Sequence, residues 1–343
     1  MMKKTRFMAV VALILCTAMV FAACSTGGAK TEQYPSRPIN LIIPFGAGGG
    51  TDVWNRALAA EMEKTLGVKV LANNMAGGGP GGTGTNYVWT QPHDGYAIAG
   101  TSETPLTIPV MTKDMNQTAK DWEYYIAGGS PGLLLVNKNI GYKDFQSLID
   151  AANSKPNQIK IACTNGGLWF LLGNLLPTYG NVPLGVATYD GSRPAITACV
   201  SGETAAVVAS AGEVADFIKS GDLIPLAVMG KEGYDFPGFG KIDSVTVKAP
   251  SVEKYLPLKQ FIGFMVPKDT PDSVKAKLKE AFDAAMKSED IKKFADSQYA
   301  VVINLTGEDA RNLASKAQST MCWMLSDMGK TERSPEETGI PKP

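Results

Sequence analysis

The chain has 343 residues, of which 44% are hydrophobic and 19% charged, and its 33 basic side chains are balanced by 33 acidic ones. This length and composition suit two globular domains of ordinary size and exclude an intrinsically disordered chain. Because there is no basic excess, the sequence gives no electrostatic reason to expect nucleic acid as a partner.

The first 23 residues predict a secretory signal peptide. Lys3, Lys4 and Arg6 precede an apolar run, residues 7–21, and Ala22-Ala23-Cys24 follow it. A basic start, a short apolar run and small residues are typical of such a signal. Cys24 after two alanines resembles the lipobox of bacterial lipoproteins, so we expect lipid on Cys24, with plain cleavage after Ala23 as the alternative. Residues 24–33 would then form a tether, and the mature chain would carry 30 basic against 33 acidic side chains, a net charge of −3.

A strand, a glycine turn and a helix are predicted in succession between residues 39 and 66. The apolar run 39–43 is followed by Pro44–Asp52, which holds four glycines, and then by a helix to Leu66 with apolar residues recurring every fourth position. Glycines let the backbone approach a ligand, and the first helical turn offers unpaired N–H groups. The stretch Pro44–Asp52 therefore predicts a seat for an anion. Asp52 either caps the helix, reaches the ligand through water, or accepts directly from a hydroxyl or amine of the ligand, and the residues alone leave these three readings open.

The same pattern recurs along the chain and predicts two α/β units with glycine loops at the carboxyl ends of their strands, where open α/β sheets bind ligands. Residues 133–136 and 261–267 read as strands that cross between the units, which implies a two-strand hinge. Residues 231–257 are expected to be a surface connection, and the C-terminal block is expected to be helical, without a strand of its own. The other predicted strands are 68–71, 97–100, 158–163, 186–189, 205–209 and 223–229. The other predicted helices are 86–90, 144–154, a helix that follows the loop 164–169 and runs to about Leu176, 194–200 with Ser192 as N-cap, 213–219, 272–286, 290–296 and 308–324.

Other chemistries find little support. Gly77–Gly82 matches G-x-G-x-x-G, but Pro80 removes an N–H from such a phosphate loop, so the glycines are better explained by a turn and close helix packing. His93 is the only histidine and lies in a polar turn, and no G-x-S-x-G is present. We therefore expect no catalytic site, no metal and no cofactor. Cys163 and Cys199 either form a disulfide or remain buried thiols together with Cys322.

Several segments, in this order, resemble the tripartite tricarboxylate transporter receptor family, also called Bug receptors. The resemblance covers nearly all of the mature chain. It rests on Tyr34-Pro35-Ser36-Arg37-Pro38-Ile39, Ile43-Pro44-Phe45, Gly48-Gly49-Gly50-Thr51-Asp52, Asn74 with Gly77–Gly82, Pro92–Tyr96, Tyr189-Asp190-Gly191 and Ser201-Gly202-Glu203.

The resemblance implies a type II periplasmic-binding-protein-like α/β fold. Two domains, residues 34–132 with 262–343 and residues 133–261, would be joined by a two-strand hinge and would close on a carboxylate in the cleft between them. It also implies a monomeric, extracytoplasmic, membrane-anchored receptor that hands its ligand to permease subunits; a ligand sensor feeding a signalling partner is the alternative. The implied ligand-binding residues are Phe45, Ala47, Gly48, Gly49, Thr51, Asp52, Ser102, Thr104, Thr164, Asn165, Gly166, Gly167, Trp169, Tyr189, Asp190 and Ser210.

One departure from the family pattern bears on the ligand. Asp190 stands where lysine is common in the family, and this replaces a positive charge by a negative one. Trp169, beside the Gly166-Gly167 turn, is expected to form a wall of the site. We therefore expect a mono- or dicarboxylate with an apolar or aromatic body, rather than a highly charged tricarboxylate.

Overall fold

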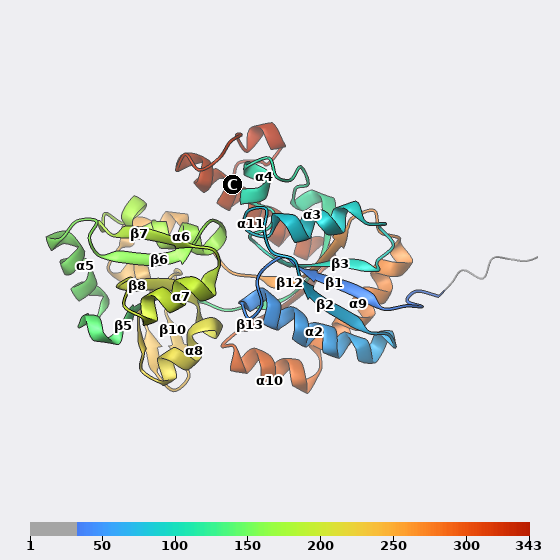
Figure 1. The fold of residues 1–343 in the computed structure, drawn as a ribbon, viewed down its shortest axis with the longest axis horizontal. Helices are drawn as coiled ribbons and strands as arrows, with labels where there is room; N and C mark the ends of the chain where they lie inside the picture. Colours follow the sequence, from blue (N-terminus) through green and yellow to red (C-terminus); the bar gives the residue numbers. More distant parts are fainter. Residues whose placement is uncertain (1–32) are drawn as a thin grey trace, which may run out of the picture. The chain divides into compact units, whose positions relative to one another are not determined.

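The computed structural model describes residues 33–343, so the predicted signal peptide and the lipidation at Cys24 lie outside the described residues. Arg37–Pro343 form one compact unit. Within Arg37–Pro343 the chain builds two sheets, each with its own helices, and we call these the first and second lobes (Figure 1).

The first lobe is a six-stranded sheet in the order β13-β4-β12-β3-β1-β2. β1, β2 and β3 are parallel, whereas β12 runs antiparallel to β3 and β4, and β13 antiparallel to β4. The strands are β1 (Ile39–Ile43), β2 (Val70–Asn74), β3 (Ala97–Ser102), β4 (Trp122–Gly129), β12 (Ile262–Pro267) and β13 (Val301–Thr306), and the helices are α2 (Gly50–Leu66), α3 (Gly82–Thr90), α4 (Ile108–Met111), α9 (Asp272–Met286), α10 (Glu289–Ser297) and α11 (Gly307–Asp327).

The second lobe is a five-stranded sheet in the order β7-β6-β8-β5-β9. β6 is parallel to β7 and β8, and β5 is antiparallel to β8 and β9. Its strands are β5 (Gly132–Asn137), β6 (Lys160–Thr164), β7 (Gly185–Tyr189), β8 (Ala206–Ser210) and β9 (Leu223–Val228), its helices are α5 (Phe145–Ser154), α6 (Gly167–Tyr179), α7 (Ser192–Val200) and α8 (Ala211–Lys219), and β10 (Tyr234–Phe236) and β11 (Gly240–Ile242) form a separate hairpin.

Helix α2 illustrates how the apolar spacing produces this packing. Trp54, Leu58, Met62 and Leu66, which recur every fourth residue, are all buried. Gly67 ends the helix in the left-handed conformation, with φ +72°, and donates its N–H to the Glu63 carbonyl at 3.0 Å. The buried stripe holds α2 on the sheet, so the start of the helix is fixed next to the end of β1.

The second lobe buries both faces of its sheet, and β5 shows the alternation expected of a central strand. Leu133 and Leu135 belong to the cluster on one face, and Leu134 and Val136 to the cluster on the other. Cys163 lies in the cluster of Leu134, whereas Cys199 lies in the cluster of Leu133. Cys163, Cys199 and Cys322 are free and buried. The structure therefore agrees with the buried-thiol alternative and not with a disulfide between Cys163 and Cys199.

Three sequence expectations need correction. The C-terminal block does contain a strand, because β13 pairs with β4 at the edge of the first sheet. β4 itself, one of the inner strands of this sheet, was not anticipated. The N-cap of α7 is Gly191 and not Ser192, which is already the first helical residue and uses its hydroxyl elsewhere.

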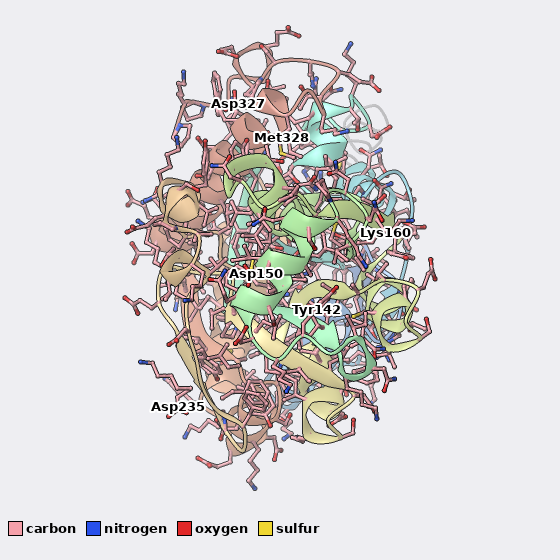
Figure 2. All side chains as sticks on the ribbon, turned by 90° about the vertical axis from the view of Figure 1, so that its left-hand side faces the viewer. Tyr142, Asp150, Lys160, Asp235, Asp327 and Met328 are labelled. Atoms are coloured by element: carbon pink, nitrogen blue, oxygen red, sulfur yellow. The ribbon has the colours of Figure 1, made fainter. Side chains whose placement is uncertain are left out.

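The chain crosses between the lobes at two places, between β4 and β5 and again just before β12. At the first crossing the Ser130 N–H donates to the Gln260 side chain at 2.9 Å, so the two crossings lie against each other. Helix α11 contacts both lobes: it packs on β4, and Met321, Met324 and Leu325 join the apolar core of the second lobe. Its end, at Asp327 and Met328, lies on the face that also carries Asp150 of α5 (Figure 2). The residue limits of the two domains stay a prediction.

Candidate functional site

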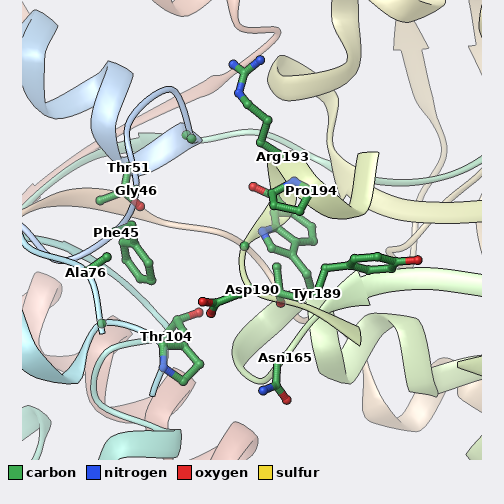
Figure 3. Close-up of a pocket in the computed structure, with 18 of the residues that line it drawn as sticks. Phe45, Gly46, Thr51, Ala76, Thr104, Asn165, Tyr189, Asp190, Arg193 and Pro194 are labelled. Atoms are coloured by element: carbon green, nitrogen blue, oxygen red, sulfur yellow. The ribbon is translucent and has the colours of Figure 1, made fainter. Parts of the chain in front are cut away.

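A cavity of about 690 Å³ lies between the two lobes, a size that suits a small-molecule ligand. The first lobe lines it with the loops that follow β1, β2 and β3, and the second lobe with the loops that follow β6 and β7 and with the starts of α7 and α8. Figure 3 shows the labelled residues facing one another across this space, with Phe45, Gly46, Thr51, Ala76 and Thr104 on one side and Asn165, Tyr189, Asp190 and Pro194 on the other.

Most of the residues named from the sequence line this cavity. They come from both lobes and from loops up to about 145 residues apart in the chain, which the fold brings together. They are Phe45, Ala47, Gly49, Thr51, Ser102, Thr104, Thr164, Asn165, Gly166, Trp169, Tyr189 and Asp190. Trp169 both lines the cavity and belongs to the core of the second lobe, since its side chain is almost fully buried.

Four of the named residues lie outside the lining, each for a structural reason. The Gly48 N–H donates to the Asp52 carboxylate at 2.8 Å, which turns both groups toward the loop. A Cβ on Gly167 would lie 2.4 Å from Thr104 Cγ2, so this glycine serves the close packing of the two lobes. The Ser210 hydroxyl caps α8 by accepting from the Glu213 N–H at 3.4 Å.

Asp52 is the hub of the loop after β1. Its carboxylate accepts hydrogen bonds from the Gly48 N–H at 2.8 Å, from Asn74 Nδ2 at 2.8 Å and from Arg56 Nε at 2.9 Å. Burial opposes ionisation of this carboxyl, but the hydrogen bonds from Gly48 and Asn74 and the charge of Arg56 outweigh it and hold its pKa below the usual value. In this geometry Asp52 fixes the shape of the loop and does not face the cavity.

Four helices have an N-cap residue that lines the cavity, and in all four this residue is a glycine without any side-chain cap. These N-caps are Gly49 of α2, Gly81 of α3, Gly166 of α6 and Gly191 of α7, and each of them lines the cavity. A glycine N-cap offers no side-chain acceptor to the first N–H groups of its helix. The convergence of four such helix starts gives the cavity a set of backbone donors and positive dipole ends suited to an anion.

The structure adds charged residues that the sequence analysis missed: Glu103, Arg193, Glu203 and Glu213 line the cavity. Arg193 is the only lysine, arginine or histidine among the described lining residues, and its guanidinium donates to the Gly48 carbonyl at 2.9 Å, from one lobe to the other. The position of Arg193 next to the Asp190-Gly191 loop was the signal that could have revealed it. Glu213 carried no such signal, because it reaches the cavity from the first turn of α8.

Two of these acids have distinctive environments. Glu103 is almost fully buried and accepts from the Phe261 N–H at 3.1 Å. Burial, with a smaller contribution from the charge of Glu213, raises the pKa of Glu103 to about 7. Glu203 accepts from the Tyr189 hydroxyl at 2.8 Å, and burial together with this hydrogen bond raises the pKa of Tyr189 to about 12.

Within residues 33–343 there is no group of three or more His, Cys, Asp and Glu side chains that could hold a metal ion. His93 instead contacts Asp269 at 2.6 Å and the Trp89 carbonyl at 3.0 Å. In the same range no helix has the length and apolar character needed to cross a bilayer.

The glycine run 77–82, which is expected to serve a turn and close helix packing, contributes to the cavity as well. Gly77, Gly79, Pro80 and Gly81 line it from the first lobe, and Gly77, Gly79 and Gly81 have positive φ angles. Gly82 begins α3, so the run combines the expected turn and helix start with a part of the wall.

Comparisons with known proteins agree with this arrangement. The profile of the tripartite tricarboxylate transporter family receptor matches residues 54–325. The chain is 27% identical to Protein BugT of Bordetella pertussis over 316 residues, which cover 90% of this chain and 93% of BugT. Two solved structures share the fold: the Rhodopseudomonas palustris protein Rpa4515 with adipate, with a TM-score of 0.77, 20% identity and coverage of 86% and 98% of the two chains, and MatC of the same organism with bound malate, with a TM-score of 0.74, 22% identity and coverage of 85% and 100%.

The family profile spans well over half of the chain, and the two lobes have the architecture of periplasmic binding proteins. The chain therefore belongs to the tripartite tricarboxylate transporter receptor family.

Proposed function

We propose that this chain is an extracytoplasmic solute receptor that captures a small mono- or dicarboxylate between its two lobes and delivers it to the permease subunits of a tripartite transporter. As a member of a receptor family, it is a binding protein and not an enzyme. Lipid on Cys24 would hold the protein at the membrane. We propose that the receptor acts as a monomer. The sensor alternative has no observation in its favour among the described residues.

One observation supports a carboxylate as the ligand: the four glycine N-caps of α2, α3, α6 and α7 all line one cavity. Backbone N–H groups at helix starts bind carboxylates well because the groups are fixed and the helix dipole adds a positive potential. Two of the four starts come from each lobe. A carboxylate bound between them would hold both lobes together, which is the closure a transport receptor needs. The adipate and malate named for the two similar structures fit the same chemistry.

The proposal is tested with the full chain, purified in detergent, by thermal shift and calorimetry against a panel of organic carboxylates. A ligand at 100 times its dissociation constant adds about 2.7 kcal/mol to the free energy of unfolding, which is readily measured. At least one carboxylate should bind saturably at one site. If no carboxylate shifts the unfolding temperature, the proposed function is wrong.

The seat is tested by Gly49→Ser. Gly49 has an ordinary φ of −80°, and a Cβ there would meet no atom closer than 3.8 Å, so the fold should tolerate serine. The new hydroxyl can accept N–H groups of the first turn of α2, and we expect carboxylate affinity to fall about tenfold while stability changes by only a few tenths of a kcal/mol. Pro271→Ser is the matched control, because it offers a cap to α9, whose N-cap lies outside the cavity lining. Unchanged affinity in Gly49→Ser would place the carboxylate elsewhere.

A further inference from the structure

The side chains around the cavity carry an excess of negative charge. Among the described lining residues the acids are Glu103, Asp190, Glu203 and Glu213, and Arg193 is the single base. Backbone N–H groups therefore attract an anion, whereas most of the charged side chains repel one. In a ligand with several carboxylates, any carboxylate that is not bound by the N–H groups of a helix start would be repelled by these acidic side chains.

Glu213 already occupies part of the anion seat. It extends from α8 of the second lobe, and its Oε1 accepts from the N–H of Gly50, the first residue of α2 in the first lobe, at 3.2 Å. The same oxygen accepts from the Ser192 hydroxyl, and Oε2 accepts from the Ser210 hydroxyl at 2.6 Å. The protein thus places a carboxylate of its own at one of the four helix starts, where three donors hold it.

The carboxylate of Asp190 also faces the space where a ligand would bind. No hydrogen bond or ion pair joins its carboxylate to another residue within 33–343, and Figure 3 shows it directed into the space between the lobes, toward the side of Phe45 and Thr104. The nearest lining base in sequence, Arg193, is engaged with the Gly48 carbonyl across the cleft. Asp190 therefore has the properties expected of an acceptor that a ligand cation or N–H group would satisfy.

We propose that Glu213 is a specificity-determining residue that supplies the second carboxylate of this site, so that the ligand carries a single carboxylate and, at its other end, a protonated amine that faces Asp190. This inference rests on the proposed function and narrows it from carboxylates in general to zwitterionic amino carboxylates. The ligand carboxylate takes the N–H groups that Glu213 leaves open at the four helix starts, including those of the first turn of α2 after Gly50. A dicarboxylate is disfavoured, because its second charge falls beside Glu213 or Asp190.

The test compares three ligand classes on the full chain by thermal shift and calorimetry: amino monocarboxylates, plain monocarboxylates and dicarboxylates, each with two to eight carbons. The wild-type protein should bind its best amino monocarboxylate at least tenfold more tightly than any dicarboxylate. In Glu213→Gln this preference should shrink at least tenfold, because dicarboxylates gain affinity. Asp216→Asn is the matched control: it removes the same charge from the same helix, but its side chain is 97% exposed and outside the cavity lining, and the preference should not change.

Asp190→Asn provides a second, independent readout, since its side chain is exposed and makes no contact on which the fold depends. It should weaken amino carboxylates about tenfold relative to plain monocarboxylates, because the amine loses its acceptor while every carboxylate escapes one repelling charge. A wild-type preference for dicarboxylates, or a preference that Glu213→Gln leaves intact, would overturn the role of Glu213. Equal affinity for plain and amino monocarboxylates would refute the proposal that a ligand amine faces Asp190. Failure of all three classes in every variant would instead refute carboxylate binding itself.

Discussion

Helix starts at the cavity differ from helix starts elsewhere in the molecule. Helices α5 and α10, whose N-caps do not line the cavity, begin with Asp144 and Ser288, whose side chains accept N–H groups of the first turn at 2.7 and 3.1 Å. Helices α2, α3, α6 and α7 begin with glycine and have no such cap. Compared with a serine or aspartate cap, a glycine N-cap costs its helix a few tenths of a kcal/mol. Helices α9 and α11 also lack a side-chain cap, but they begin after Pro271 and Thr306, outside the cavity. Among the described α-helices, a glycine N-cap occurs only where a ligand could accept the first N–H groups.

The largest effect is expected from Gly166→Ala. Gly166 has φ +99° and ψ 171°, a region that is essentially restricted to glycine, and a Cβ would lie 2.9 Å from Ile108 and from Pro80 of the other lobe. We expect a loss of about 1–3 kcal/mol in the free energy of unfolding, from the strained backbone. Carboxylate affinity should fall roughly 100-fold, because the start of α6 is displaced from the opposite lobe. Urea unfolding and calorimetry measure the two quantities.

Gly221→Ala is the control that separates the effect of backbone strain from the effect of changing the cavity wall. Gly221 also has a positive φ, +74°, but no atom lies within 4 Å of its would-be Cβ, and it does not line the cavity. This variant should lose stability and keep its carboxylate affinity. If both glycine variants lose affinity alike, the effect of Gly166 is global and the comparison of helix starts is wrong.

A smaller effect is expected from Asp52→Asn, and it should appear chiefly as lost stability, because the buried carboxylate holds the shape of the loop after β1 without facing the cavity. An asparagine cannot accept all three of its hydrogen bonds, and because the donors on Gly48, Arg56 and Asn74 are half-buried or exposed, we expect a cost of about 0.5–1.5 kcal/mol at pH 7. The pKa of Asp52 is lowered on folding, so its ionised form contributes stability that is present above its unfolded pKa near 3.8 and is lost as pH falls through the folded value. Wild-type stability should therefore fall below about pH 4 through this group, and the variant should lack that part of the decline.

The smallest effect is expected from Ser288→Ala at the start of α10. Loss of the cap to the Ile291 N–H should lower the free energy of unfolding by about 1 kcal/mol and leave carboxylate affinity unchanged. Chemical denaturation with and without ligand measures both. A change in affinity here would mean that remote helix starts also influence the cavity.

Much of the fold could be predicted because local signals and tertiary packing agree. The apolar stripe of α2 and the glycine loop before it indicated both the helix and the seat at its start. β13 could not be found in this way: Val301 and Val302 are exposed, Asn304 has a positive φ, and the strand pairs only along one side, so no apolar alternation marks it.

The parts of the site that are formed by backbone groups could be predicted from the sequence. The parts that are formed by long side chains could not. Glycine turns after strands identified the loops around Gly49 and Gly166, because the chemistry of those loops is local. Glu213 reaches Gly50, 163 residues away in the chain, and no periodicity or motif encodes such a contact. Ser192 was assigned to cap α7, but tertiary structure directs its hydroxyl to Glu213 instead.

The contact between the two chain crossings has a mechanical consequence. A Cβ on Gly129 would lie 2.2 Å from the Gln260 carbonyl oxygen, so only glycine lets the backbones touch there. Two strands in direct contact resist sliding and permit rotation about the line through them, as in hinge motions generally. Gln260 lines the cavity close to this axis, whereas the outer rims of the lobes lie at the ends of long levers. The length of a bound molecule therefore sets the angle between the two lobes, and this angle sets the distance between their outer rims. A partner that contacts only the outer surfaces of both lobes can in this way distinguish one bound molecule from another.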